Sequence, residues 1–198
     1  MNQELIIFIK NPVEGNVKTR IAASLGNVKA LEIYKQLLDI TRDTVINVKC
    51  GKYLFYSDKI ENDSWISSIF HKHLQKGDTL GERMKNAFEL LFSKQANKVV
   101  IIGSDCPELT SEIINTAFNV LDEKDVVIGP AKDGGYYLLG MKKPLSILFE
   151  NKEWSTDSVF EDTIVDLMEN RLTYTLLPTL SDVDNIYDLH LLNGRFGS

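Results

Sequence analysis

The chain has 198 residues, of which 43% are hydrophobic and 25% are charged, and a formal net charge of -6. This length predicts one domain over residues 1–198 with a substantial core. The acidic balance argues against nucleic-acid binding, which usually needs a basic surface. Cys50 and Cys106 have neither metal-ligand spacing nor a disulfide framework. The N-terminal apolar run is too short for a signal peptide, and no segment approaches the roughly 18 to 20 apolar residues of a membrane span. A cytoplasmic protein is expected.

Apolar runs and helical periodicities alternate along the chain. Strands are predicted at 4–10, 52–57, 71–75, 99–102, 125–131, 135–141 and 172–177. Helices are predicted at about 28–48, 79–94, from 110 onward, 157–170 and 185–193. The connection between the fifth and sixth strands is too short for a crossover helix, so this pair should be locally antiparallel or bent. The pattern predicts an α/β fold, a three-layer α/β/α sandwich with a mixed, mostly parallel seven-stranded sheet.

The loop after the first strand reads "IKNPVEGNVKTRIA" and concentrates positive charge in an acidic protein. It contains Lys10, Lys18 and Arg20. Pro12 and Gly15 allow the chain to turn tightly after the strand. A loop that runs from a strand's carboxyl end to a helix N-terminus is well placed to bind a phosphate. Arginine can grip a phosphate bidentately, and lysine acts as a point charge. The alternative is a solvated basic loop, and neither the dinucleotide fingerprint nor the Walker pattern is present.

The stretch "VVIIGSDCPELT" ends a buried-strand signal at Asp105. Either Asp105 is an ordinary residue of a strand-to-helix turn, or it lies in a metal or phosphate site at the carboxyl edge of a parallel sheet. Magnesium or manganese favours one or two carboxylates together with substrate phosphates. Asp184 can supply the second carboxylate, because Asn185 and Asp188 resemble the N-cap and N3 residues of the following helix and leave Asp184 unexplained.

Two glycines directly follow a third carboxylate in "GPAKDGGYYLLG". Gly134 and Gly135 let a backbone approach a ligand or adopt positive φ, and Asp133 could bind hydroxyls or act as a base. The alternative interpretation is a hairpin turn, for which Asp-Gly is a strong signal.

Two further stretches carry weaker signals. Gln75 and the backbone near Gly77 could contact a nucleobase edge, because an amide is both donor and acceptor. Trp154 is either a core anchor or a stacking platform, and Thr156 either lines a site or caps the next helix.

Six stretches in order along the chain resemble the motifs of one family, the DUF2064 proteins. They are "FIKNPVEGNVKTRIA", "LQKGDTLGERMKNAF", "IIGSDCPEL", "IGPAKDGGYYLLG", "EWSTDSV" and "DVDNIYDL". DUF2064 proteins are small bacterial GT-A-type glycosyltransferase-like proteins, related to the nucleotide-diphospho-sugar transferases and to guanylyl- and cytidylyltransferases. The resemblance implies the Rossmann-like GT-A fold over nearly the whole chain.

The resemblance also implies roles for particular residues. Lys18 and Arg20 fall in the basic element that suggests contact with nucleotide phosphates, and Ser104 with Asp105 would face a metal-bridged diphosphate. Asp105 and Asp184 match the acidic residues of the metal site. The remaining matched positions are Gln75 and Gly77 beside the base, Asp133, Gly134 and Gly135 toward the sugar or acceptor, and Trp154 and Thr156 as acceptor-pocket walls. Two departures are the Asn185-Ile186 pair where Thr-Pro is common, and the absence of a strict Asp-x-Asp at Asp105.

Three functions follow from these features. The first is a metal-dependent glycosyltransferase that uses Mg²⁺ or Mn²⁺, a nucleotide-sugar donor and a small-molecule acceptor, with Asp105 and Asp133 as catalytic residues. The second is a nucleotidyltransferase that releases pyrophosphate, although the Gly-rich first loop typical of sugar nucleotidyltransferases is absent. The third is a non-catalytic nucleotide-binding domain. The sequence leaves the oligomeric state, the base, the sugar and the acceptor open.

Overall fold

Strands and helices alternate along the chain, and the computed structural model describes residues 2–193. The strands are β1 (Gln3–Ile9), β2 (Gly51–Tyr56), β3 (Phe70–Leu74), β4 (Lys98–Ile102), β5 (Val126–Pro130), β6 (Tyr136–Met141) and β7 (Tyr174–Leu176). The α-helices are α1 (Thr19–Leu25), α2 (Asn27–Ile46), α3 (Leu80–Ser93), α4 (Ser111–Val120), α5 (Val159–Glu169) and α6 (His190–Asn193), and the 3₁₀-helices are η1 (Ser146–Phe149) and η2 (Ile186–Leu189). None of the helices within residues 2–193 is both long and apolar enough to span a bilayer.

Seven strands form one sheet within the described part of the chain, in the order β3-β2-β1-β4-β6-β5-β7. The pairs β1·β2, β1·β4, β2·β3 and β5·β7 are parallel, whereas β6 is antiparallel to β4 and β5. The predicted mixed, mostly parallel sheet is confirmed. The reversal at β6 follows from the short β5–β6 connection, which cannot hold a crossover helix.

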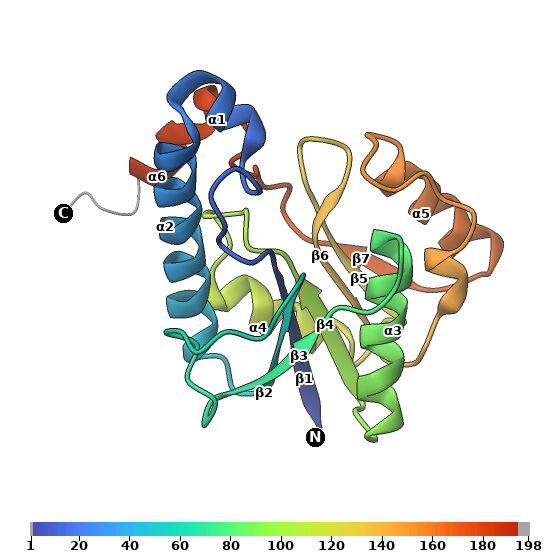
Figure 1. The fold of residues 1–198 in the computed structure, drawn as a ribbon. Coiled ribbons are helices and arrows are strands. Elements are labelled where there is room, and N and C mark those ends of the chain that lie inside the picture. The colour runs from blue at the N-terminus through green and yellow to red at the C-terminus, as the bar shows by residue number, and fades with distance from the viewer. Residues whose placement is uncertain (1, 194–198) are drawn as a thin grey trace.

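Helices cover both faces of the sheet, as Figure 1 shows, and this arrangement confirms the predicted three-layer sandwich. Successive residues of a strand point to opposite faces. Ile7 of β1 and Val100 of β4 therefore pack toward α2 and α4, while Ile6 and Ile101 pack toward α3 and α5. Every residue of β4 is buried, as is typical of a parallel-sheet strand covered on both sides.

Side-chain caps fix where several helices begin. Thr79 and Glu82 form a capping box at α3, and Thr110 caps α4 as its sequence predicts. The predicted capping box of Asn185 and Asp188 is also present. The segment that it begins differs from the predicted helix over 185–193, because it winds first as the 3₁₀-helix η2 and then as the short α6.

Helix α1 was not expected from the sequence, which predicts a loop up to about residue 28. This helix has only seven residues, and Ile21 is the one residue of it that is buried. A single buried position gives no helical periodicity to detect. Gly26, with a positive φ of 83°, ends α1 and lets α2 begin directly after it.

Candidate active site

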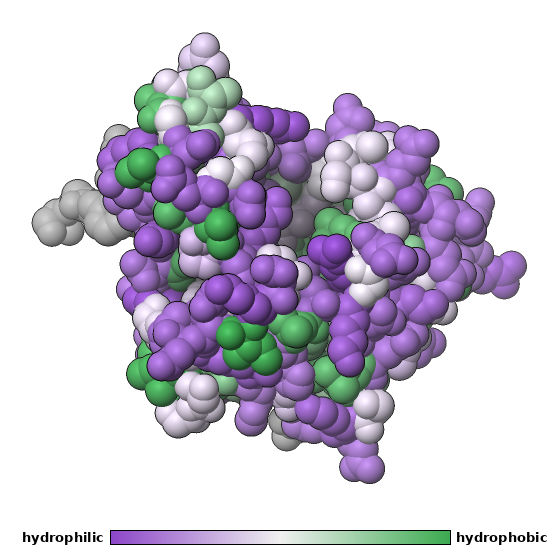
Figure 2. All heavy atoms as spheres, viewed as in Figure 1, coloured by the Kyte–Doolittle hydropathy of each residue, from purple (hydrophilic) through white to green (hydrophobic). Residues whose placement is uncertain are grey.

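A cleft of about 640 Å³ lies at the edge of the sheet where the parallel strands end. The loops after β1, β4 and β5 and the segment after β7 meet there, which is the usual ligand site of open α/β sheets. Figure 2 shows the surface hollowed between the α1 region and the β5–β6 turn. We name its two sides the polar wall (Lys18, Arg20, Asp105, Asp182 and Asp184) and the apolar wall (Phe8, Leu80, Met84, Trp154 and Val159).

Lys18 is the centre of the polar wall. Its Nζ lies 2.9 Å from Asp105 Oδ1 and 3.6 Å from Asp184 Oδ1, and it donates a hydrogen bond to the carbonyl oxygen of Val183 at 2.6 Å. The lysine side chain is only 6% exposed. Its backbone is left-handed, with φ 47°, a conformation that costs a non-glycine residue about 1–2 kcal/mol. The contacts of its ammonium group hold it in this conformation.

Residues 177–184 bring the last carboxylates of the polar wall to the cleft. Leu177 and Leu180 donate backbone hydrogen bonds to Ile128 and Pro130, so the segment continues the line of β7 along β5. The amide of Val183 then donates to the carbonyl oxygen of Asp105 at 2.9 Å. This backbone link places Asp182 and Asp184 beside the loop that follows β4.

Negative charge exceeds positive charge along the polar wall. The pKa of Asp182 is raised to about 7, first by burial and then by three neighbouring carboxylates, with Lys18 acting in the opposite direction. Asp105 Oδ1 is buried against the ammonium group of Lys18, while the rest of the Asp105 side chain is partly exposed to the cleft. Arg20 is 77% exposed and reaches Asp184 at 3.8 Å, so its guanidinium remains open to the solvent. The wall can accept further positive charge.

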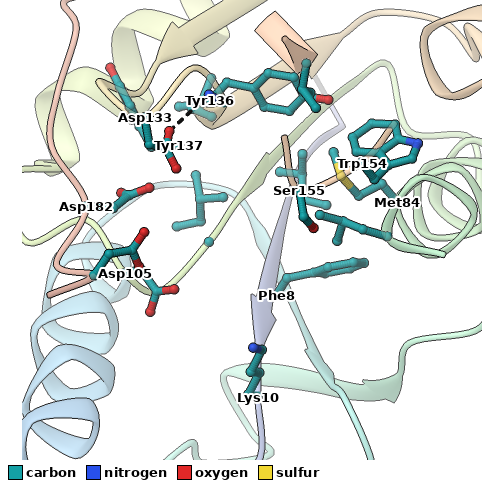
Figure 3. Close-up of a pocket in the computed structure, with 18 of the residues that line it drawn as sticks. Phe8, Lys10, Met84, Asp105, Asp133, Tyr136, Tyr137, Trp154, Ser155 and Asp182 are labelled. Atoms are coloured by element: carbon teal, nitrogen blue, oxygen red, sulfur yellow. Dashed lines mark hydrogen bonds between the residues drawn. The ribbon is translucent and has the colours of Figure 1, made fainter. Parts of the chain in front are cut away.

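The β5–β6 turn carries Asp133 into the cleft, as Figure 3 shows. Asp133 Oδ1 accepts a hydrogen bond from the amide of Gly135 at 3.0 Å, which fixes the carboxylate on the turn. Gly134 has φ 88°, and a β-carbon there would lie 2.1 Å from the carbonyl oxygen of Asp157. Its own carbonyl accepts from Phe160 at 2.9 Å. Gly134 therefore holds the turn against the start of α5.

Trp154 forms much of the apolar wall. Its ring stacks on Phe149, with ring centroids 6.2 Å apart and planes inclined by 18°. The indole edge sits over Gly81 of α3, where an added β-carbon would lie 2.2 Å from Trp154 Nε1. Figure 3 places Trp154, Met84 and Phe8 across the cleft from Asp105, Asp133 and Asp182.

The structure brings nine of the predicted site residues together around the cleft. They are Lys10, Lys18, Arg20, Asp105, Asp133, Gly135, Trp154, Thr156 and Asp184. Six others do not line it: Pro12, Gly15, Gln75, Gly77, Ser104 and Gly134.

The side chain of Gln75, directly after β3, donates hydrogen bonds to two backbone carbonyls. Its side-chain Nε2 donates to the carbonyl oxygens of Ile9 and Phe55 at 3.0 and 3.1 Å, which ties the carboxyl ends of β1, β2 and β3 together. Gly77 accepts a hydrogen bond from Arg83 Nε at 2.9 Å. In this structure both residues make contacts that stabilise the loop before α3.

Tyr34 of α2 is a cleft residue that the sequence did not single out as functional. Its hydroxyl accepts from the amide of Lys10 at 2.8 Å and lies 3.3 Å from Ser104 Oγ. Burial raises the pKa of this phenol, and the charge of Asp105 raises it further. In the sequence Tyr34 belongs to the apolar stripe of a helix, so it is indistinguishable from a core residue.

A family model described as "Uncharacterized protein conserved in bacteria (DUF2064)" matches residues 41–156. The chain belongs to the DUF2064 family. This confirms the family expected from the six sequence motifs. The comparison with curated proteins finds no match.

Solved structures share the fold of this DUF2064 chain. A protein of Desulfovibrio desulfuricans G20, provisionally described as a nucleotide-diphospho-sugar transferase, is 31% identical, with a TM-score of 0.88 over 97% of this chain and 87% of that one. The 4-diphosphocytidyl-2C-methyl-D-erythritol synthase of Anaerococcus prevotii is 15% identical, with a TM-score of 0.63 over 98% and 96% of the two chains. The inositol-1-phosphate CTP transferase of T. maritima is 13% identical, with a TM-score of 0.56 over 97% and 95%. The fold is that of the nucleotide-diphospho-sugar transferases.

Proposed function

We propose that this protein is a metal-dependent transferase that takes a glycosyl group from a nucleoside diphosphate sugar and passes it to a small acceptor. One observation carries the proposal: Lys18, Asp105 and Asp184, from three distant parts of the sequence, meet at one end of the cleft. Arg20 lies beside them with an exposed guanidinium, the group best shaped for bidentate phosphate binding. The likeness to the D. desulfuricans protein supports the same class of reaction.

Asp105 and Asp184 fit the binding of a divalent cation. Among the described residues no group of three or more His, Cys, Asp or Glu side chains is disposed to hold a metal ion. Magnesium and manganese, however, need only one or two protein carboxylates when phosphates supply the other ligands. The Asp105 side chain lines the cleft and is 43% exposed, so its carboxylate remains accessible to a cation although Lys18 pairs with its Oδ1. When bound, Mg²⁺ or Mn²⁺ would neutralise charge on the diphosphate.

The chain's own residues divide the remaining tasks. Arg20 and Lys10 would bind the phosphates of the donor. Lys18 would hold the carboxylates of Asp105 and Asp184 in position. Asp133 would take the proton from the acceptor hydroxyl, since its carboxylate lines the cleft on a turn fixed by Gly135. The apolar wall would keep bulk water from the reacting centre.

The same cations and carboxylates would also serve a nucleotidyltransferase, so the products distinguish the two reactions. The first step is a thermal-shift panel of nucleotides and nucleotide sugars with and without Mn²⁺, because a ligand of the folded state raises the melting temperature. The stabilising donor is then incubated with a set of alcohols and phosphorylated alcohols. Release of a nucleoside diphosphate supports glycosyl transfer. Release of pyrophosphate from a nucleoside triphosphate would replace this proposal by the nucleotidyltransferase, and a panel without any stabilising nucleotide would reject both.

A further inference from the structure

The apolar wall is continuous with the core on one face of the sheet. Met84 belongs to the cluster that fills the space between the sheet and helices α3 and α5, and Phe8 and Trp154 pack against that cluster. At the cleft this core is left open, and Leu80 at the first position of α3 is 41% exposed. The cleft therefore ends in an accessible apolar surface.

This surface is built to keep its shape. Trp154 is held between Phe149 and the bare backbone of Gly81, and any β-carbon at position 81 would displace the indole. A wall that is already in place needs little reorganisation on binding, which favours affinity for a ligand of matching shape.

We infer that the apolar wall binds a hydrophobic ring or chain of the acceptor, so that the acceptor is an alcohol on an apolar body rather than a free sugar or polyol. This inference rests on the proposed function. A polyol lying on Phe8, Leu80 and Met84 would leave hydroxyl groups poorly satisfied, because these side chains offer only the weak thioether acceptor of Met84. An apolar body would instead cover these side chains while its hydroxyl group points across the cleft to Asp133.

The two tryptophans of the chain provide a direct readout. Trp154 lines the cleft, whereas Trp65 is 2% exposed and packs edge-on against Phe70. In ¹⁵N-labelled protein each indole N–H gives its own signal, and Trp154→Phe identifies the signal that belongs to the cleft. Trp65 then serves as an internal reference in the same spectrum.

The probe is benzyl alcohol, with glycerol as the polar comparison, titrated into the intact protein. We expect a saturable shift of the Trp154 signal with benzyl alcohol, no shift of Trp65, and no saturable shift with glycerol. Leu80→Asp should weaken benzyl alcohol binding at least tenfold. This variant should fold, because Leu80 is exposed and an acidic residue suits the first turn of a helix.

Val28→Asp is the matched control, since Val28 is 61% exposed in the first turn of α2 and does not line the cleft. It should bind benzyl alcohol like the native protein. Equal binding of glycerol, a shift that never saturates, or an unchanged affinity in Leu80→Asp would overturn the inference. The titration needs no nucleotide, so its outcome is separate from that of the thermal-shift panel. Saturable binding of benzyl alcohol by a protein that binds no nucleotide would support the apolar subsite and reject the proposed transferase function.

Discussion

The amide of Val183 donates a hydrogen bond to the carbonyl oxygen of Asp105, at 2.9 Å across 78 residues of sequence. Through this bond the segment after β7 and the loop after β4 form one rim of the cleft. Lys18 spans the same rim, since its ammonium group contacts the backbone of Val183 and the carboxylate of Asp105. The polar wall is thus held by backbone and side-chain contacts together.

Replacing Lys18 by Met should destabilise the metal-free protein. The change removes the ammonium that lies between Asp105 and Asp184 and retains most of the apolar stem. We expect a loss of about 1.5–3 kcal/mol, the range for hydrogen bonds to charged groups, measured by urea unfolding. Lys29→Met is the control, because the exposed Lys29–Glu32 pair on α2 should contribute at most about 0.5 kcal/mol. Equal losses in both variants would show that Lys18 is not an anchor of the wall.

Replacing Arg20 by Ala should weaken nucleotide binding with little change in stability. The side chain is 77% exposed, so its removal leaves the core intact. Loss of its charged hydrogen bonds to phosphate should cost about 1.5–3 kcal/mol of binding free energy, roughly a tenfold to hundredfold rise in Kd. Calorimetry with the nucleotide found by the thermal-shift panel measures this change. An unchanged Kd would remove Arg20 from the phosphate site.

Replacing Asp105 by Asn should abolish the dependence of nucleotide binding on Mn²⁺. The amide keeps the shape of the carboxylate but removes the charge that would attract a divalent cation. The fold should persist, because the backbone carbonyl of Asp105 still accepts from Val183. Titrations with and without Mn²⁺ measure the effect, and Asp58→Asn on an exposed loop is the control. Retention of the full Mn²⁺ effect in Asp105→Asn would support the turn interpretation of this residue.

Replacing Asp133 by Asn should reduce turnover by about 10²–10⁴-fold while nucleotide binding survives. The amide oxygen can still accept from Gly135, so the turn keeps its shape and only the base is lost. The rate is measured at saturating donor, and the donor Kd is measured separately. An active Asp133→Asn variant would exclude Asp133 as the base and would favour nucleotidyl transfer, in which the attacking phosphate needs none.

Asp125 should contribute to stability in a way that depends on pH. Its pKa is lowered from 3.8 to about 2, mainly by hydrogen bonds from the hydroxyl and amide of Thr173, with Lys142 adding a smaller effect. A lowered pKa in the folded state means that the stabilisation is complete above pH 3.8 and is lost as the pH falls toward 2. Asp125→Ala should cost about 1–2 kcal/mol at pH 7 and progressively less below pH 4, measured by urea unfolding across pH. A cost that does not change with pH would contradict the charge-based explanation.

Local patterns in the sequence predict most of the fold. Continuous apolar runs such as that of β4 identify strands buried on both faces, and the caps Thr110 and Asn185 identify helix starts. The gathering of Lys18, Asp105 and Asp184 also follows from the sequence, since each comes after a strand whose carboxyl end must lie at the same edge.

Contacts between distant segments limit what the sequence predicts at the site. Gln75 has the chemistry to contact a base, which stays a prediction, and only the strand order reveals that its side-chain amide also bridges β1 and β2. The hydrogen bonds of Tyr34 to Lys10 and Ser104 are hidden for the same reason. Gly81 gives no functional signal until Trp154, 73 positions later, is found resting on it.

The two walls of the cleft come from different stretches of the chain. The polar wall is built from residues 18–20, 105 and 182–184, while the apolar wall draws on residues 80–84 and 154–159 together with Phe8. Mutations that remodel one wall therefore leave most of the other unchanged. If the proposed function holds, substitutions within α3 and the 150–158 loop would change acceptor preference and leave the donor end of the cleft intact. Grafting that loop and the first turn of α3 from one relative onto another is a rational route to exchanged acceptor range.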